Sequence, residues 1–168
     1  MPIAPEWSGR MIEPAPRPAR FEIPVDLAAI GPVVEQVIAA CRGHLPDGAD
    51  GVEIADCVAL ALTEALNNCV EHAYLGTGCG RIVIETELPP GALVLHVSDR
   101  GRPPPLATVR AADMPDPEDL PERGWGWALI HRLTDRVDYA RRDGWNRLTL
   151  ERRFWRYYEP STAWMRGA

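Results

Sequence analysis

A single long helix limits the folds open to this chain, because its apolar stripe requires another layer of structure to pack against. Residues 50–74 keep helical periodicity, with Leu62 and Leu66 on one arc of the helix. Asp50 is followed three residues later by a glutamate, which predicts a capping box at the start. Glycines from Gly76 onward end the pattern. We therefore expect one helix over residues 50–74, with one side buried.

The last turns of this expected helix carry polar side chains where a buried helix would be apolar. Asn68 and Glu71 lie within roughly 60° of Glu64 on a helical wheel. Lysine and arginine, which are common on solvated faces, are absent from residues 49–75. Oxygen ligands without a neighbouring cation suit a hard ion such as Mg²⁺, and a lone carboxylate can orient or deprotonate a hydroxyl. The helix alone leaves a solvated face and a polar site as equal alternatives.

Short runs of β-branched and aliphatic residues predict five strands, and helical spacing predicts two further helices. The expected strands are 21–25, 81–88, 92–99, 136–141 and 146–154, and the expected helices are 33–41 and 125–134. Asp143-Gly144 predicts a tight hairpin between the last two strands. The helices are grouped rather than alternating with every strand, which favours the α+β class over a doubly wound parallel fold. We expect a two-layer α/β sandwich, with a mixed, mostly antiparallel sheet packed on three helices.

The length of 168 residues fits one domain, with a segment outside the domain at each end. Residues 1–18 contain five prolines and little apolar periodicity, which is typical of a flexible arm. Residues 156–168 are expected to be a C-terminal tail. The domain itself is expected to cover residues 19–155.

Charge and composition exclude several classes of function. The formal net charge of −6 argues against direct binding to nucleic acid. No run approaches the roughly 18 apolar residues that span a bilayer, and the N-terminal stretch lacks the apolar core of a secretion signal. The cysteines show no CxxC spacing, so we expect reduced thiols in a cytoplasmic protein without a membrane partner. They are Cys41, Cys57, Cys69 and Cys79.

Two glycine-bearing turns are placed to bring ligand-binding groups to a pocket. Asp99 ends the strand 92–99, where a carboxylate can accept from an exocyclic amine, and Gly101 allows close approach to the backbone. Gly124 and Gly126 open a helix, whose free N–H groups suit a phosphate. Each pattern alone is more often a structural turn than a binding site.

The three patterns together are far more specific than any one of them. E-x-x-x-N on a helix, D-x-G after a strand and G-x-G after a loop, in that order, resemble the GHKL (histidine-kinase-like) ATPase superfamily. Within it, the chain most resembles the anti-sigma factor serine/threonine-protein kinases. The matching segments are TEALNNCVEHAY, VSDRGRPPP, ERGWGWALIHRLTDRVDY and WNRLTLERRF. The resemblance covers residues 21–154 and implies the Bergerat ATP-binding fold, with ATP and Mg²⁺ as cofactors.

The resemblance implies a role for each matching residue of the helix and strands. Glu64 would be the general base that polarises the attacking hydroxyl, and Asn68 would bind the Mg²⁺ that bridges the nucleotide phosphates. Asp99 would accept a hydrogen bond from the adenine amine, and Gly101 would let the base approach. Asn146 would complete the adenine site, where relatives often have threonine.

The second glycine turn and the segment before it are implied to surround the phosphates. Gly124, Trp125 and Gly126 would line the phosphates at the helix start, and Arg123 is the arginine best placed to reach one. Residues 102–123 would form the nucleotide lid. This segment holds six prolines and shows almost no periodicity, so we expect it to be structureless.

The function implied by the resemblance is that of an ATP-binding anti-sigma regulatory factor and kinase. Such a protein binds a sigma factor, phosphorylates a serine of a STAS-type antagonist and is often a homodimer. The lid departs from the family pattern, because three prolines follow Arg102 and no glycine occurs between Gly101 and Gly124. A non-catalytic, nucleotide-sensing protein-binding module of the same fold is therefore the alternative. An autophosphorylating histidine kinase is disfavoured, because His72 lies inside the proposed site.

Overall fold

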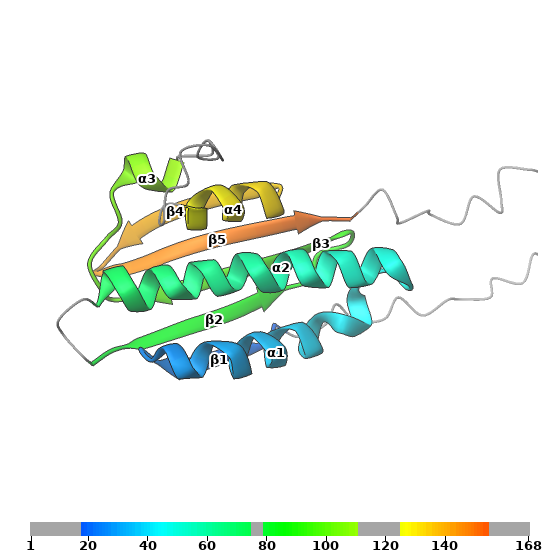
Figure 1. Cartoon of the computed structure of the whole chain (residues 1–168), viewed down its shortest axis with the longest axis horizontal. Coiled ribbons are helices and arrows are strands. Elements are labelled where there is room, and N and C mark those ends of the chain that lie inside the picture. Colours follow the sequence, from blue (N-terminus) through cyan, green and yellow to red (C-terminus); the bar gives the residue numbers. More distant parts are fainter. Residues whose placement is uncertain (1–17, 75–78, 111–124, 155–168) are drawn as a thin grey trace, which may run out of the picture.

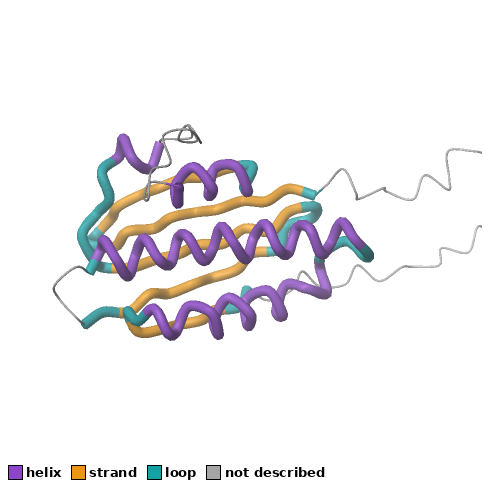
Figure 2. The backbone as a smooth tube through the Cα atoms, in the orientation of Figure 1, coloured by secondary structure: helices purple, strands orange, loops and turns teal. Residues whose placement is uncertain are grey.

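The computed structural model describes residues 18–74, 79–110 and 125–154, which form a five-stranded sheet with helices over one face (Figures 1 and 2). The strands are β1 (Arg20–Pro24), β2 (Arg81–Glu87), β3 (Ala92–Asp99), β4 (Arg136–Arg142) and β5 (Trp145–Arg153). The helices are α1 (Ile30–Cys41), α2 (Ala49–Asn68), α3 (Leu106–Arg110) and α4 (Trp125–Leu133). Short turns extend them: the 3₁₀ turns η1 (Leu27–Ala29) and η2 (Arg42–His44), and the π turn η3 (Cys69–Ala73) that continues α2.

The strands lie across the sheet in the order β1-β2-β3-β5-β4, and each neighbouring pair is antiparallel. The expected two-layer α/β sandwich is confirmed. The described strands include no parallel pair, so this sheet is wholly antiparallel, where the sequence predicted a mixed, mostly antiparallel one. Asp143 and Gly144 close the hairpin between β4 and β5 with φ angles of 51° and 80°. Two consecutive positive φ angles are the mark of the tight hairpin turn that the sequence predicts.

The core lies between the sheet and α2. Ile82 and Ile84 alternate along β2 and are fully buried, because successive strand residues point to opposite faces. Leu62 and Leu66 of α2 are also fully buried, one helical turn apart. Both sets belong to one hydrophobic cluster, which α1 joins through Val37. The apolar stripe of α2 therefore packs the helix against the sheet, and the polar side chains at its end are not needed for this packing.

The start of α2 differs from the expected capping box. The helix begins at Ala49 after Gly48, whose φ is 74°, and no side chain caps it. Asp50 lies inside the first turn, where its charge suits the positive end of the helix. The capping prediction is wrong because the chain before the helix folds back over it: a Cβ at Gly51 would lie 1.8 Å from the carbonyl oxygen of Pro46.

The first part of the expected lid contains a short helix. Residues 106–110 form α3, so the prediction of a structureless segment is wrong for them. Two backbone N–H groups of α3 donate to the carbonyl of Pro105, 3.0 and 3.1 Å away. A proline with its fixed φ angle suits the first turn of a helix, which explains why a proline-rich segment can still begin one.

Several sequence predictions fall on residues that the structure does not describe. Arg123 and Gly124, the lid from residue 111, the arm up to residue 17 and the tail 156–168 all lie outside the described residues. The domain limits at residues 19 and 155 therefore stay a prediction. Among the described helices, none combines the length and the apolar character needed to cross a membrane.

Candidate functional site

The polar end of α2 faces the start of α4. Glu64 and Asn68 lie one helical turn apart on α2, and both are half-buried. Gly126, in the first turn of α4, lies directly against them. A Cβ at Gly126 would be 3.0 Å from Glu64 Oε2 and 3.7 Å from the amide atoms of Asn68. The absence of a side chain at Gly126 thus allows the backbone of α4 to approach this carboxylate and this amide.

The amide of Asn68 is incompletely hydrogen-bonded. Its Nδ2 atom is buried and has no hydrogen-bond partner within the described part of the chain. Leaving a buried polar group unpaired costs on the order of 1–3 kcal/mol. A ligand group bound beside Asn68 would remove this cost, so the amide fits a role in holding a ligand better than a role in packing.

Asp99 ends β3 with a buried carboxylate, 4% exposed. Its Oδ1 accepts hydrogen bonds from the backbone N–H of Gly101 at 2.6 Å and from Asn146 Nδ2 at 2.9 Å. Its Oδ2 accepts from the thiol of Cys69, with a sulfur–oxygen distance of 3.7 Å. Oδ1 is thus held by the protein, whereas Oδ2 has one weak donor and retains capacity to accept from a ligand.

Asn146 connects Asp99 to the neighbouring hairpin. It stands opposite Asp99 in the pairing of β3 with β5 and is 2% exposed. Its Nδ2 also donates to the carbonyl of Gly101 at 3.2 Å, and its Oδ1 accepts from Tyr139 at 2.8 Å and from Arg141 at 2.5 Å. Both ends of the amide are therefore occupied by protein groups. The structure places Asn146 as the support of Asp99 and of the turn after it.

The turn after β3 packs tightly on the π turn η3. A Cβ at Gly101 would lie 2.6 Å from both the Cβ and the carbonyl oxygen of Ala73. The N–H of Arg102 donates to that same carbonyl at 2.8 Å. The glycine is thus required for contact with η3, which is a second reason for its presence beside the role implied by the family resemblance.

The π turn also determines where Cys69 lies. A π turn widens the helix locally, and such turns occur frequently at functional sites. Cys69 is the first residue of η3, and its thiol reaches the carboxylate of Asp99. Burial raises the pKa of Cys69 well above its ordinary value, and the negative charge of Asp99 raises it further. The thiol therefore stays protonated and acts as the donor to Asp99.

These groups border a cavity of about 660 Å³, which is within the usual size range of ligand pockets. Three residues predicted from the sequence line it: Asn68, Asp99 and Asn146. Apolar lining comes from Ala65, Val97 and Leu148, the prolines Pro103, Pro104 and Pro105, and Trp127, and further polar lining comes from His72, Arg102, Thr108 and Tyr139. The cavity thus combines an apolar interior with a few polar groups, as a site for an aromatic base would.

The remaining sequence-predicted residues lie in different places. Glu64 and Gly126 meet beside Asn68, but neither they nor Gly101 nor Trp125 line this cavity. Arg123 and Gly124 are outside the described residues. The structure therefore brings Glu64, Asn68 and Gly126 together in one group. It brings Asp99, Gly101 and Asn146 together in a second group around the turn after β3, and Asn68 lines the same cavity as Asp99 and Asn146.

The lining residues that sequence reasoning missed include Cys69, Trp127 and Tyr139. Cys69 and Trp127 directly follow two predicted site residues, and that adjacency was an available signal. Tyr139 carried no local signal, because it reaches Asn146 only through the pairing of β4 with β5. Burial raises the pKa of Tyr139, which keeps its hydroxyl protonated as the donor to Asn146.

Comparisons with known proteins agree with this architecture. The family model described as the histidine kinase-like ATPase domain matches residues 23–152. The curated serine/threonine-protein kinase BtrW of Bordetella bronchiseptica is 34% identical over 99 residues, which cover 54% of this chain and 65% of BtrW. The crystal structure of the RsbU and RsbW domains of Rv1364c from Mycobacterium tuberculosis matches with a TM-score of 0.58. That match has 21% identity and covers 82% of this chain and 32% of the other.

The chain spans less than two thirds of the length of either relative. The likeness to the Mycobacterium structure supports the fold alone, given its low identity. The family model, in contrast, extends from β1 to β5 and includes the polar end of α2, the turn after β3 and the start of α4. The chain therefore belongs to the family of histidine kinase-like ATPase domains.

Proposed function

We propose that this protein is an ATP-binding anti-sigma regulatory factor that acts as a serine/threonine-protein kinase. Membership of the ATPase family and the likeness to BtrW support this proposal. The observation that carries it is the meeting of Glu64, Asn68 and Gly126, because phosphoryl transfer requires a carboxylate, an amide and the positive end of a helix in one place.

The residues of the cavity fit Mg-ATP. Asn68 offers an amide oxygen, and Mg²⁺ typically takes one or two protein oxygens together with the nucleotide phosphates and water. Among the described residues, no group of three or more His, Cys, Asp or Glu side chains is arranged to hold a metal ion. In this proposal Asn68 holds Mg²⁺ jointly with the phosphates, and Asp99 Oδ2 accepts from the adenine amine.

Glu64 is the proposed general base. It lies one turn before Asn68, so it can take the proton of a serine hydroxyl that attacks the terminal phosphate. Gly124, Trp125 and Gly126 are the proposed phosphate-binding turn, with Arg123 as the phosphate-contacting arginine and residues 102–123 as the lid. Asn146 and Gly101 hold the adenine-binding carboxylate in place.

The proposed protein partners rest on the same family membership and on the likeness to BtrW. We propose that the chain binds a sigma factor, phosphorylates a STAS-type antagonist and works as a homodimer in the cytoplasm. The proposed domain covers residues 19–155, between an N-terminal arm and a C-terminal tail.

Calorimetry with Mg-ATP and a phosphate-transfer assay together test the proposal. Glu64→Gln should bind Mg-ATP like the wild type and lose transfer of labelled phosphate to a STAS-type protein encoded nearby. Asn68→Ala should bind Mg-ATP about tenfold or more weakly, a loss of about 1.4 kcal/mol. Equal Mg-ATP affinity in wild type and Asn68→Ala would contradict the metal assignment, and full transfer by Glu64→Gln would contradict the base.

The lid favours one alternative function, a nucleotide-sensing module without catalysis. Pro103, Pro104 and Pro105 line the cavity directly, and prolines restrict the backbone movement that lid closure needs. In that case the wild type would bind Mg-ATP tightly but transfer no phosphate to any STAS-type candidate. The two assays therefore distinguish the kinase from the sensor.

A further inference from the structure

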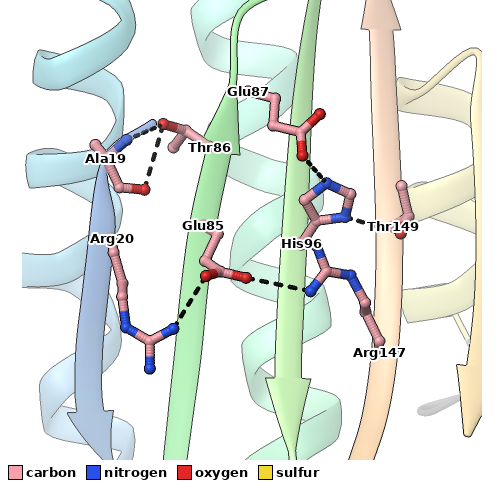
Figure 3. Close-up of polar contacts among 8 residues, drawn as sticks. All are labelled: Ala19, Arg20, Glu85, Thr86, Glu87, His96, Arg147 and Thr149. Carbon is pink, nitrogen blue, oxygen red and sulfur yellow. Dashed lines mark hydrogen bonds and ion pairs between the residues drawn. The ribbon is translucent and has the colours of Figure 1, made fainter. Parts of the chain in front are cut away.

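The face of the sheet opposite the helices carries charged side chains in cross-strand pairs. Figure 3 shows Glu85 of β2 between Arg20 of β1 and Arg147 of β5, at 3.0 and 3.2 Å. On the same face His96 lies between Glu87 and Thr149, at 3.1 and 3.0 Å (Figure 3). Alternation along the strands explains this face, because their other side chains point to the helices.

Two neighbouring hollows open on this face where β3 ends. Their volumes are about 990 and 370 Å³, and they share Arg20, Val83 and Trp145, so they form one groove. We call it the arginine groove, after the six arginines that line it. They are Arg20, Arg81, Arg100, Arg102, Arg142 and Arg147.

The arginine groove has the opposite charge to the protein as a whole. Its six arginines face two lining glutamates, Glu22 and Glu85, a formal excess of four positive charges in a chain of net charge −6. Arg100 and Arg102 form no ion pair within the described part of the chain. Arg142 pairs with the exposed Asp143, at 3.5 Å, and such surface pairs are weak.

Part of the lining of the arginine groove is apolar. The guanidinium of Arg100 stacks over the ring of Trp145, 4.5 Å from its centre. Val83 and Ala140 line the groove next to this ring. An occupant therefore meets an aromatic platform between cations, which suits a segment with carboxylates on both sides of an apolar residue.

We propose that the arginine groove binds an acidic segment of a partner protein, with one apolar side chain of that segment on Trp145. A nucleic acid fits the same groove less well. Its charged backbone extends beyond a small patch and its affinity comes from many phosphate contacts, whereas the rest of this chain is acidic and repels it. A short acidic segment matches an excess of four charges and need not reach the remaining surface.

Along β3 and β5 the arginine groove lies on the opposite side of the sheet from the cavity. Beyond the end of β3 the two meet, because His72, Ala73 and Arg102 line both. On the inner side Asn146 holds Asp99, and on the outer side their chain neighbours Trp145 and Arg100 stack on each other. A partner in the groove would therefore contact the turn that carries Asp99. The proposal goes beyond the nucleotide function and does not depend on it.

Fluorescence anisotropy with labelled peptides tests this proposal on the full chain. The probe is a short peptide of glutamates around a central leucine, and its matched control replaces each glutamate by glutamine. We expect the acidic peptide to bind and the neutral one not to bind, with affinity falling as salt rises from about 50 to 200 mM. The double variant Arg81→Glu/Arg142→Glu should weaken binding about tenfold or more.

Arg136→Glu is the matched control, because Arg136 belongs to the outer face but does not line the groove. It should keep wild-type affinity for the acidic peptide. Arg81 and Arg142 have side-chain exposures of 74% and 91%, so their replacement leaves the core intact, which unchanged urea midpoints would verify.

Four results would overturn the proposal. The first is that the acidic peptide does not bind, and the second is that Arg136→Glu loses as much peptide affinity as the double variant. The third is that a single-stranded oligonucleotide binds more tightly than the acidic peptide. The fourth is that Arg81→Glu/Arg142→Glu changes the oligomeric state without changing the peptide affinity. The last result would make the groove an interface between copies of the chain.

Discussion

Asn146 shows how one buried side chain can organise a site through its hydrogen bonds to other protein groups. Its amide donates to Asp99 and accepts from Tyr139, so it transmits the position of β4 to the carboxylate of β3. Gly126 acts by the opposite means, because the lack of a side chain brings the backbone of α4 to Glu64 and Asn68. Each residue has a separate consequence that can be measured.

Replacing Asn146 by alanine should lower both stability and Mg-ATP affinity. The change removes the acceptor of the Tyr139 hydroxyl and one of the two donors to Asp99 Oδ1, which costs about 1–3 kcal/mol in the free energy of unfolding. Asn146→Thr should recover part of the loss, because a hydroxyl can both donate and accept. Urea unfolding and calorimetry measure the two effects, with Ser98→Ala on the outer face as the control. Wild-type values for Asn146→Ala would show that the network is dispensable.

Gly126→Ala should weaken Mg-ATP binding about tenfold, because its Cβ would lie 3.0 Å from Glu64 Oε2 and displace that carboxylate. Gly31→Ala is a matched control: Gly31 is also the second residue of its helix, and its added Cβ meets nothing within 4 Å. That control should keep the wild-type affinity for Mg-ATP. Calorimetry that found the same affinity in all three proteins would contradict the assigned contact.

At the scale of elements, the hairpin of β4 and β5 and the π turn η3 decide which side chains meet. The hairpin turn sets the register that places Arg141 opposite Asn146. A slip of one residue would move Asn146 to the outer face. The π turn η3 also positions side chains of the site, since it directs Cys69 to Asp99 and Ala73 to Gly101.

Gly144→Ala should therefore destabilise the protein through its backbone alone. Gly144 has a φ of 80°, and an alanine there costs about 1–2 kcal/mol although its Cβ would meet nothing within 4 Å. Gly43→Ala also meets nothing within 4 Å, but Gly43 lacks a positive φ, so this control should not be destabilised. Urea unfolding compares the two variants. Equal stability in both would mean that the turn conformation contributes nothing to the hairpin.

At the scale of the whole molecule, one sheet separates two surfaces of different chemistry. The helices cover one face of the sheet (Figure 1), where the core and the cavity lie. The charged side chains of the other face line most of the arginine groove. The core also contains ionisable groups whose burial ties stability to pH. Burial raises the pKa of Cys41 from 9.0 to about 11, and it also raises the pKa of Cys69, Tyr74 and Tyr139.

Stability should therefore fall at alkaline pH. A thiol with a raised folded pKa is ionised more readily in the unfolded chain, so its contribution is complete below pH 9.0 and is lost as pH rises to about 11. One such group changes the free energy of unfolding by at most about 1.4 kcal/mol per pH unit. Cys41→Val should show a shallower decline in urea unfolding between those pH values. An identical decline in the variant would contradict the assignment to Cys41.

Local patterns were enough to predict the strands, the long helix and the hairpin turn, because each depends on residues close in sequence. The order of E-x-x-x-N, D-x-G and G-x-G was likewise enough to identify the ATPase family, which the family model confirms. Local patterns failed at the start of α2 and at α3, where the chain around Pro46 and Pro105 decides the conformation.

The polar stretch of α2 by itself left two explanations open, the order of the three motifs favoured a polar site, and the tertiary structure places α4 against this stretch. That contact joins Glu64 to Gly126, and the support of Asp99 by Asn146 joins residues 47 positions apart. The arginine groove likewise draws its cations from four strands and the turn after β3. No local pattern encodes these contacts between distant residues, since the contacts form only when antiparallel pairing and helix packing bring separate segments together.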